Sequence, residues 1–333
     1  MTAFLPAFLA RNAGRESRRG SLKSCATMDC MPAVEISGVT KTFGEVTAVD
    51  HLNLNVPEGS VFGFIGPNGS GKTTTLRMIV NIFYPDRGQI RVLGEPMSAA
   101  RNHLIGYLPE ERGLYRKMQV RPLLEFFGEL RGGRKVKREV HTWLTRLDLA
   151  HCAERRVDTL SKGMSQRVQF IAAVVPEPKL LILDEPFTGL DPVSADVLRD
   201  AILDLRRRGA TVILSTHDMT VAETMCDHIC MIYRGRKVLD GTLASIQDEY
   251  ANDTIRVAVG GGMAMLGDLP GVEKVRDLGQ VQELRMALGC DPHQVLCALV
   301  GRTRVTSFSV AKPSLHDIFV RIAGPAAEEV EVA

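Results

Sequence analysis

Apolar and polar residues follow two different periods along this chain, and the shorter period marks its strands. Residues 34–39 and 52–56 alternate at every second position, which predicts strands with one buried face. Short, continuous apolar runs predict strands that are buried on both faces. Such runs occupy residues 61–65, 180–183, 211–215 and 231–233.

Segments with the longer, helical period lie between these strands. They cover residues 72–81, 123–130, 140–149 and 166–174, and a further helix opens at Asp191 and Pro192. The alternation of strands with helices predicts an α/β fold. Residues of about 113–175 form a largely helical block between two strand-rich blocks, and we expect an inserted helical subdomain there.

A second, smaller pattern begins near residue 242. Strand-like segments cover residues 254–259, 272–278, 281–288 and 305–310, and helices start at Asp291 and Ser314. We therefore expect a main domain over 32–241, a small α+β accessory domain over 242–323 and a tail over 324–333. The accessory domain carries no catalytic motif, which leaves regulation, dimer contacts or partner docking as its role.

Charge and composition exclude some classes of protein. Lys plus Arg number 41 and Asp plus Glu 39, and aromatic residues are 5%, so neither a basic surface nor a stacking platform for nucleic acid is expected. The longest apolar runs fall short of the roughly 18 residues that span a bilayer. We expect no direct membrane span and no nucleic-acid partner.

The first 31 residues and the cysteines carry weaker signals. An apolar stretch precedes a basic one in residues 1–31, the reverse of a signal peptide, so we expect a disordered tail or an over-long start, with a transit peptide as the alternative. Seven scattered cysteines fit free thiols in a reducing compartment. Cys226 and Cys230, interpreted as one helical face, are expected to be buried rather than to ligate a metal with His228.

The strongest chemical signal is a glycine-rich loop between the strand at 61–65 and the helix at 72–81. It fits the pattern G-x-x-x-x-G-K-[ST], whose backbone N–H groups close around phosphates at a helix N-terminus. Lys72 is expected to reach the β- and γ-phosphates, and Thr73 to ligate Mg²⁺. The loop consists of Gly66, Pro67, Asn68, Gly69, Ser70, Gly71, Lys72 and Thr73.

Two carboxylates follow the buried strand at 180–183. The carboxyl end of a strand is where open α/β sheets bind ligands. Asp184 is therefore expected to hold Mg²⁺ and Glu185 to act as the general base on the attacking water. Without the glycine-rich loop, the pair would equally fit two acids at the start of a solvated loop.

With these motifs the chain resembles the ATP-binding subunit of an ABC transporter over residues of about 34–240. The fold that this implies is a P-loop NTPase core with an antiparallel β subdomain. Residues 160–164 are similar to the family's signature sequence, which meets the nucleotide of a second subunit. The resemblance therefore implies that Ser161, Lys162, Gly163 and Met164 act in trans.

The resemblance assigns roles to further positions. Phe43 stands where the family stacks an aromatic ring on adenine, and Thr74 is placed with the ATP-binding loop. Asp191 belongs to a segment that signals across the dimer, and His217 is similar to the switch histidine at the γ-phosphate. Taken alone, Phe43 would more often be a core residue and His217 a structural one.

Two positions depart from the family pattern. Lys162 and Met164 replace the glycine and glutamine of the commonest signature, while Ser161 and Gly163 are retained. Glu110 replaces a glutamine that ligates Mg²⁺ and senses the membrane partner. A carboxylate binds Mg²⁺ more strongly but adds negative charge beside Glu185.

Residues 107–115 and 313–319 resemble one exporter branch of the family, which includes sodium-extruding and drug-efflux systems. The resemblance implies ATP and Mg²⁺ as cofactors and a homodimer or heterodimer of ATPase subunits. It also implies a separate membrane permease and a cytoplasmic location on the inner face of the membrane. An importer subunit and a soluble, non-transport ABC ATPase remain as alternatives.

Overall fold

The computed structural model describes residues 31–97, 103–111, 113–132, 135–250, 254–260, 266–287 and 290–324. The expected N-terminal tail up to residue 30, Arg112 of the exporter-like segment and the tail beyond Gly324 lie outside these residues. A six-stranded sheet carries the order β10-β9-β3-β8-β7-β6. Its strands are β3 (Val61–Ile65), β6 (Ile105–Leu108), β7 (Leu180–Asp184), β8 (Thr211–Thr216), β9 (His228–Tyr233) and β10 (Arg236–Gly241).

All neighbouring strands from β9 to β6 pair in parallel, and only β10 is antiparallel to its neighbour. Ile65 lies opposite Thr216, Asp184 opposite Ser215, and Leu108 opposite Leu183. The carboxyl ends of four strands therefore meet at one edge of the sheet. The residues that follow these ends are brought together, although they lie far apart in the sequence.

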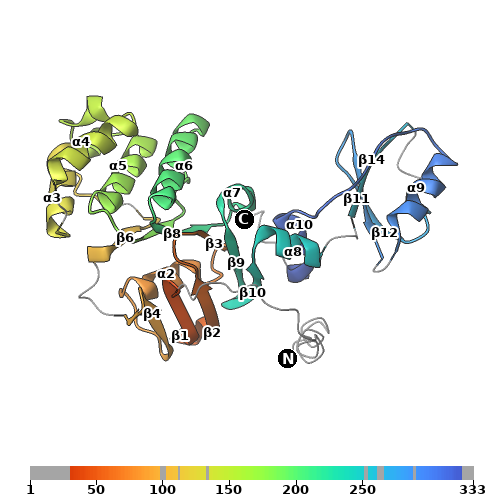
Figure 1. Cartoon of the computed structure of the whole chain (residues 1–333), viewed down its shortest axis with the longest axis horizontal. Coiled ribbons are helices and arrows are strands. Elements are labelled where there is room, and N and C mark those ends of the chain that lie inside the picture. Colours follow the sequence, from red (N-terminus) through yellow and green to blue (C-terminus); the bar gives the residue numbers. More distant parts are fainter. Residues whose placement is uncertain are drawn as a thin grey trace. The chain divides into compact units, whose positions relative to one another are not determined.

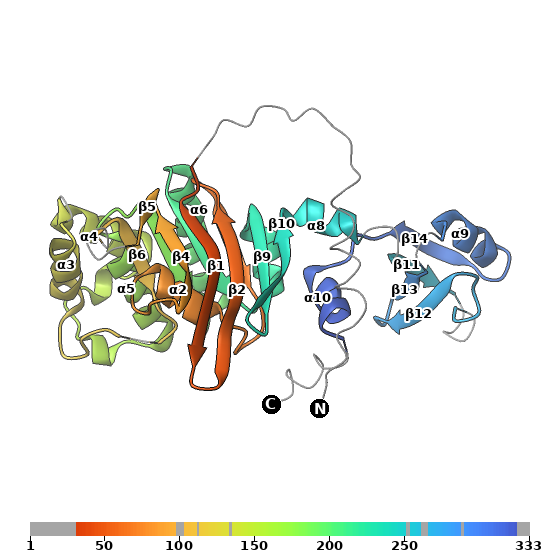
Figure 2. The same cartoon turned by 90° about the horizontal axis from the view of Figure 1, so that it is seen from below.

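A second sheet is antiparallel, with the order β2-β1-β4-β5. Its strands are β1 (Val34–Phe43), β2 (Val46–Val56), β4 (Arg87–Val92) and β5 (Glu95–Pro96), and β1, β2 and β4 run side by side in Figure 2. Helix α2 (Lys72–Ile79) packs between this sheet and the six-stranded one, because Leu76, Met78 and Ile79 share one core with residues of both. This arrangement confirms the expected antiparallel β subdomain.

A helical group covers the other face of the six-stranded sheet (Figure 1). It comprises α3 (Val120–Leu130), α4 (Val136–Arg146), α5 (Lys162–Val174) and α6 (Pro192–Arg207), with 3₁₀ turns at Ala150–Cys152 and Val157–Thr159. Helix α5 begins four residues earlier than its apolar period indicates. Ser161 caps it, accepting a hydrogen bond from the Met164 N–H at 3.2 Å, and so moves its start into the signature segment.

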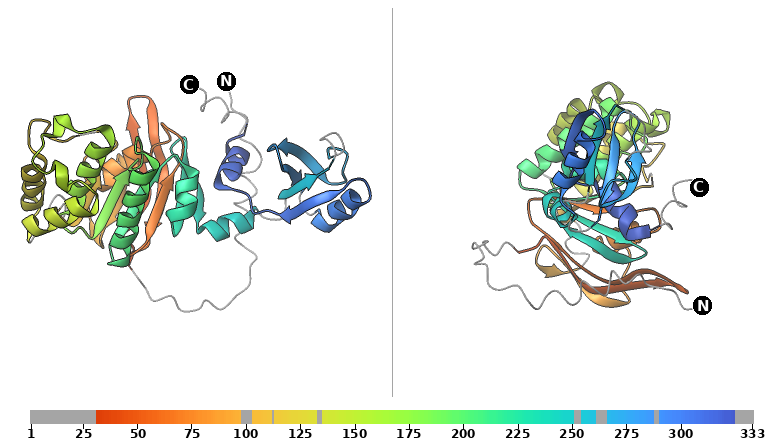
Figure 3. Two further views of the ribbon diagram at one scale, coloured as in Figure 1. Left: turned by 90° about the horizontal axis from the view of Figure 1, so that it is seen from above. Right: turned by 90° about the vertical axis from the view of Figure 1, so that its right-hand side faces the viewer.

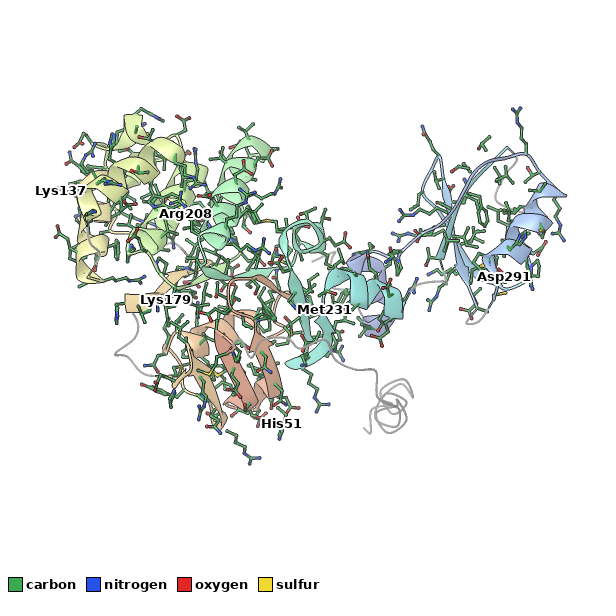
Figure 4. The ribbon with its side chains drawn as sticks, viewed as in Figure 1. His51, Lys137, Lys179, Arg208, Met231 and Asp291 are labelled. Atoms are coloured by element: carbon green, nitrogen blue, oxygen red, sulfur yellow. The ribbon has the colours of Figure 1, made fainter. Side chains whose placement is uncertain are left out.

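The C-terminal residues contribute to two cores. Strands β11 (Thr254–Val259), β12 (Val272–Asp277), β13 (Gln282–Met286) and β14 (Val305–Val310) form an antiparallel sheet with helix α9 (Pro292–Val300) against it (Figure 3). Helices α8 (Leu243–Glu249) and α10 (Leu315–Ala323) instead pack with α7 (Met219–Met225) and strand β9. Figure 4 marks Met231 on β9, in the shared core, and Asp291 at the start of α9.

The expectation that Cys226 and Cys230 share a helical face is wrong. Helix α7 ends at Met225, Cys226 is its C-cap and Cys230 lies in strand β9. The spacing of apolar residues in this segment fits a helix as well as a strand. Residues 228–231 form a strand because they pair with β3. Burial raises the pKa of the Cys226 thiol to about 12, as expected for a core thiol. Within the described part of the chain, His, Cys, Asp and Glu form no group that could hold a metal by themselves.

Candidate functional site

The glycine-rich loop joins β3 to α2 at the edge where the parallel strands end. Gly66 has φ 151° and Gly71, the N-cap of α2, has φ 106°. A Cβ on Gly66 would lie 2.2 Å from the Ile232 carbonyl oxygen, and one on Gly71 would lie 2.4 Å from that of Ala48. Only glycine fits these positions, and the loop places backbone N–H groups at the helix N-terminus, where they can surround an anion.

The side chain of Lys72 folds back over the loop. Its Nζ donates to the Gly66 carbonyl oxygen at 2.6 Å and to that of Pro67 at 3.1 Å. Burial lowers the pKa of Lys72, while the charges of Glu185, Asp184 and Glu110 oppose that change. The ammonium group is therefore held against the loop backbone, near the carboxylates of Glu185, Asp184 and Glu110.

A pocket of about 270 Å³ lies at the mouth of this loop. Within the loop, Ser70 does not line this pocket, because its side chain points inward and its Oγ is buried. Most of the lining comes from the loop and the first turn of α2, and the remainder from β2 and the ends of the strands. The lining residues are Ala48, Asn68, Gly69, Gly71, Lys72, Thr73, Thr74, Glu110 and Glu185.

Asp184 ends β7 and is completely buried. Neither carboxylate oxygen accepts a hydrogen bond from the residues that the structure describes. Burial raises the pKa of Asp184, and the neighbouring charges of Glu110 and Glu185 raise it further, while the nearby hydroxyls of Ser215 and Thr73 oppose the rise. Buried carboxylate oxygens without partners, next to a hydroxyl, fit a divalent cation such as Mg²⁺.

Glu185 is fixed from two directions. Its backbone has φ 51°, an uncommon conformation for this residue type, and its N–H donates to the Ser215 carbonyl oxygen at 3.0 Å. Its Oε1 accepts the His217 backbone N–H at 2.9 Å and lies 2.7 Å from His217 Nδ1. The His217 side chain is 54% exposed.

Glu110 follows β6, two residues after the strand ends, and lines the pocket together with Lys72 and Glu185. Glu110, the position at which the sequence departs from the family pattern, therefore lies at the same site as Lys72 and Glu185. A second pocket of about 350 Å³ adjoins it and is lined by Glu110, Glu111, Lys162, Gln166, Glu185 and Thr188.

The signature segment forms the start of α5. Lys162 lies across Gly189, where a Cβ would come within 2.7 Å of the lysine Cε, and Gly163 faces Leu190. Both therefore contact the segment that precedes Asp191. Among the described residues, those that line the loop pocket do not include 161–164.

Phe43 and Asp191 occupy the margins of the site. Phe43 ends β1, is 45% exposed and meets Phe83 edge-to-face at 5.4 Å between ring centroids, with Lys41 Nζ also 5.4 Å from its centroid. Asp191 caps α6, accepting from the Ser194 N–H at 3.0 Å and the Ser194 hydroxyl at 2.7 Å. These bonds lower the pKa of Asp191.

Comparison with known proteins agrees with this geometry. A family described as "ABC transporter" matches residues 49–188, and one described as "ATP-binding protein DrrA1-3-like, C-terminal domain" matches residues 241–323. An uncharacterized ABC transporter ATP-binding protein of Bacillus subtilis is 38% identical over 291 residues, which cover 87% of this chain and 98% of the relative. The chain belongs to the ATP-binding subunits of ABC transporters.

Other members of this family are similarly close. A Nod factor export ATP-binding protein I of Rhizobium sp. is 37% identical over 88% of this chain and 97% of its own length. A solved structure of an ATP-binding subunit of an ABC transporter has a TM-score of 0.62 and 28% identity, covering 66% of this chain and 93% of that one. The expected P-loop NTPase fold is thereby confirmed.

In this ABC subunit, sequence reasoning missed several residues at the site. Ala48 lines the first pocket, and Gln166 and Thr188 line the second. Gln166 had a usable signal, because it is a polar residue in the buried stripe of α5, where its amide donates to the Pro186 carbonyl oxygen at 3.3 Å.

None of the helices in the described ranges is long and apolar enough to cross a bilayer.

Proposed function

We propose that this chain hydrolyses ATP and thereby powers export through a separate membrane permease. The observation that carries the proposal is the position of Glu185. Its carboxylate is fixed by His217 at the edge of the pocket that contains Lys72. A carboxylate held beside a phosphate-binding loop is placed to polarise water for attack on the γ-phosphate.

Each of the other site residues has a part in this reaction. The loop N–H groups, with Asn68, Thr74 and the N-terminus of α2, bind the phosphates, and Lys72 neutralises their charge. Thr73, Asp184 and Glu110 would hold Mg²⁺, which supplies further neutralisation when bound. His217 orients Glu185 through Nδ1, and Phe43 stacks on the adenine.

The active form we propose is a dimer, as homodimer or heterodimer. The pocket at the loop is lined without residues 161–164 of the same chain, within the part that the structure describes. Ser161 and Gly163 of a second subunit would complete it, and Asp191 would carry the signal between the two sites. The N-terminus of α5, capped by Ser161, then faces the γ-phosphate.

An exposed aromatic cluster, formed by Tyr115, Phe126 and Phe127, supports a permease contact. Tyr115 and Phe126 are 57% and 42% exposed, and the Tyr115 centroid lies 6.2 Å from those of Phe126 and Phe127. Leu130, on α3 with Phe126 and Phe127, is 66% exposed. Aromatic residues of this kind are typical of protein interfaces.

Export is the direction that the relatives favour, since several are named Nod factor export ATP-binding proteins. We propose a sodium ion, a drug-like molecule or another small compound as the substrate, and a peripheral location on the cytoplasmic face of the membrane. An importer subunit and a soluble ABC ATPase are the alternatives.

A flux assay tests the proposal. The chain and the permease encoded beside its gene would be reconstituted in inverted vesicles, and ATP-dependent uptake of candidate substrates measured. We expect uptake with wild-type protein and none with Glu185→Gln. ATP-dependent movement out of these vesicles would indicate import, and hydrolysis without any permease contact would indicate a soluble ATPase.

A further inference from the structure

One buried side chain ties the segment that carries Glu110 to helix α5. Gln169 Nε2 donates to the Glu111 carbonyl oxygen at 3.2 Å and to that of Pro109 at 3.4 Å. The two carbonyl groups flank Glu110, so a single amide holds the backbone on both of its sides. Gln169 is 5% exposed, and water therefore competes little for these bonds.

Within the described ranges, no strand pairing supports the backbone at residues 109–111. The register between β6 and β7 ends at Leu108 and Leu183, which leaves residues 109–111 beyond the ladder. Strand β6 itself lies directly on α5, since a Cβ on Gly106 would come within 2.5 Å of the Ala173 carbonyl oxygen. Gln169, one turn earlier on the same helix, extends this contact to the segment past the strand end.

Packing alone does not account for a glutamine at this position. Gln169 Oε1 is buried and accepts no hydrogen bond from the described residues. An unsatisfied buried acceptor destabilises the fold, and an apolar side chain of the same size would avoid that cost. Glutamine differs from such an apolar side chain by its NH₂ group. Both hydrogen bonds of that group are directed to the backbone around Glu110.

We propose that Gln169 is a positioning residue that fixes Glu110 at the metal side of the nucleotide pocket. The inference rests on the proposed function, in which Glu110 helps to hold Mg²⁺. Helix α5 begins with Lys162 and Gly163, so the same bonds join Glu110 of one nucleotide site to the signature that serves the other. A movement of α5 relative to the six-stranded sheet would then displace Glu110 from the metal as it displaces the signature.

Binding of Mn²⁺ in place of Mg²⁺ tests the proposal without turnover. The full-length protein is saturated with a non-hydrolysable ATP analogue, and free Mn²⁺ is followed by its EPR signal. Gln169→Met keeps the volume but removes the donor, and we expect it to weaken Mn²⁺ binding about 10-fold, as loss of an outer-shell partner does. Metal-free binding of the analogue should be unchanged, because the loop residues are untouched.

A double-mutant cycle shows whether Gln169 acts through Glu110. In a Glu110→Gln background, Gln169→Met should change Mn²⁺ affinity by less than about 2-fold. Equal Mn²⁺ affinity of Gln169→Met and wild type, or an equal loss in both backgrounds, would overturn the inference. Gln169→Leu, which also lacks the donor, serves if the Met variant does not fold.

The matched control is Gln247→Met. Gln247 also donates its amide to a proline carbonyl oxygen, that of Pro313 at 3.1 Å, but it lies on α8 and lines neither pocket. We expect no change in Mn²⁺ affinity for this variant. Absence of hydrolysis by the wild-type protein would contradict the proposed function, while the Mn²⁺ cycle would still report on Gln169.

Discussion

The imidazole Nδ1 of His217 lies 2.7 Å from Oε1 of Glu185, and the His217 backbone N–H donates to the same oxygen at 2.9 Å. One carboxylate oxygen thus accepts two bonds from a single residue. The other, Oε2, accepts long hydrogen bonds from the hydroxyls of Thr188 and Thr216, each at 3.5 Å. Oε2 is therefore the less firmly held of the two carboxylate oxygens.

Replacing Glu185 by Gln should lower ATP turnover by roughly 10²–10⁴-fold, because the general base is lost while the shape is kept. Binding of ATP should persist, and the ATP-bound dimer should accumulate in size-exclusion chromatography. Glu273→Gln, an exchange on the exposed side of β12, serves as the control and should hydrolyse normally. Unchanged turnover in Glu185→Gln would remove this residue from the mechanism.

Glu110→Gln should raise the Mg²⁺ concentration needed for half-maximal hydrolysis by about 10-fold, since a charged metal ligand becomes neutral. Affinity for ATP measured without metal should not fall, because Lys72 and the loop bind the phosphates. The comparison is with Glu129→Gln on the surface of α3. Superimposable Mg²⁺ titrations of wild type and Glu110→Gln would mean that Glu110 is not at the metal.

Asp184 makes the stability of the metal-free protein depend on pH. Burial raises its pKa above the ordinary value of 3.8, so the folded state binds this proton more tightly than the unfolded state. The ionised group therefore destabilises the fold at pH values above the raised pKa. That penalty decreases as the pH falls through the raised pKa and is absent below 3.8.

Asp184→Asn should therefore have a higher Tm than wild type at pH 7 without metal, and the difference should shrink toward pH 4. Addition of Mg²⁺ and a non-hydrolysable ATP analogue should reverse the order, because only wild type keeps the metal ligand. Differential scanning calorimetry measures both effects. A lower Tm of the metal-free Asn variant at pH 7 would show that the buried charge does not destabilise the fold.

Ile318→Ala should destabilise the chain by about 2–5 kcal/mol, measured by urea unfolding, because it empties a buried position. Ile318 on α10 is completely buried among residues of β9 and α7, next to Phe319, which meets Tyr233 edge-to-face at 5.7 Å. Val300→Ala, at a position that is 66% exposed on α9, should change stability by less than about 0.5 kcal/mol. Equal stability of the two variants would mean that α10 does not pack on this core.

Phe126→Ser should abolish co-purification with the permease, because it removes one ring of the exposed aromatic cluster of Tyr115, Phe126 and Phe127. The Tm of the isolated chain should stay the same, since the side chain is partly in solvent. Val300→Ser is the matched exchange at an exposed apolar position outside the cluster. Retention of the permease by Phe126→Ser would place the docking surface elsewhere.

The sequence alone determined those features that depend on neighbouring residues. The glycine-rich loop, the cap at Asp191 and the capping box at Ser314 follow from side chains that bond to backbone a few residues away. The strand at 61–65 and the helix after it also follow from local apolar patterns. Glu110 stood out because its type departs from a pattern, which required no knowledge of its surroundings.

Tertiary structure alone decided the features that arise from distant segments. The contact of Glu185 with His217 spans two strands, and the bonds from Gln169 to the Glu110 segment span some sixty residues. Pairing with β3 made Cys230 part of a strand, and packing on β9 gave α8 and α10 a core in common with α7. Periodicity reports only which side of an element is apolar, whereas strand register and packing determine which elements meet.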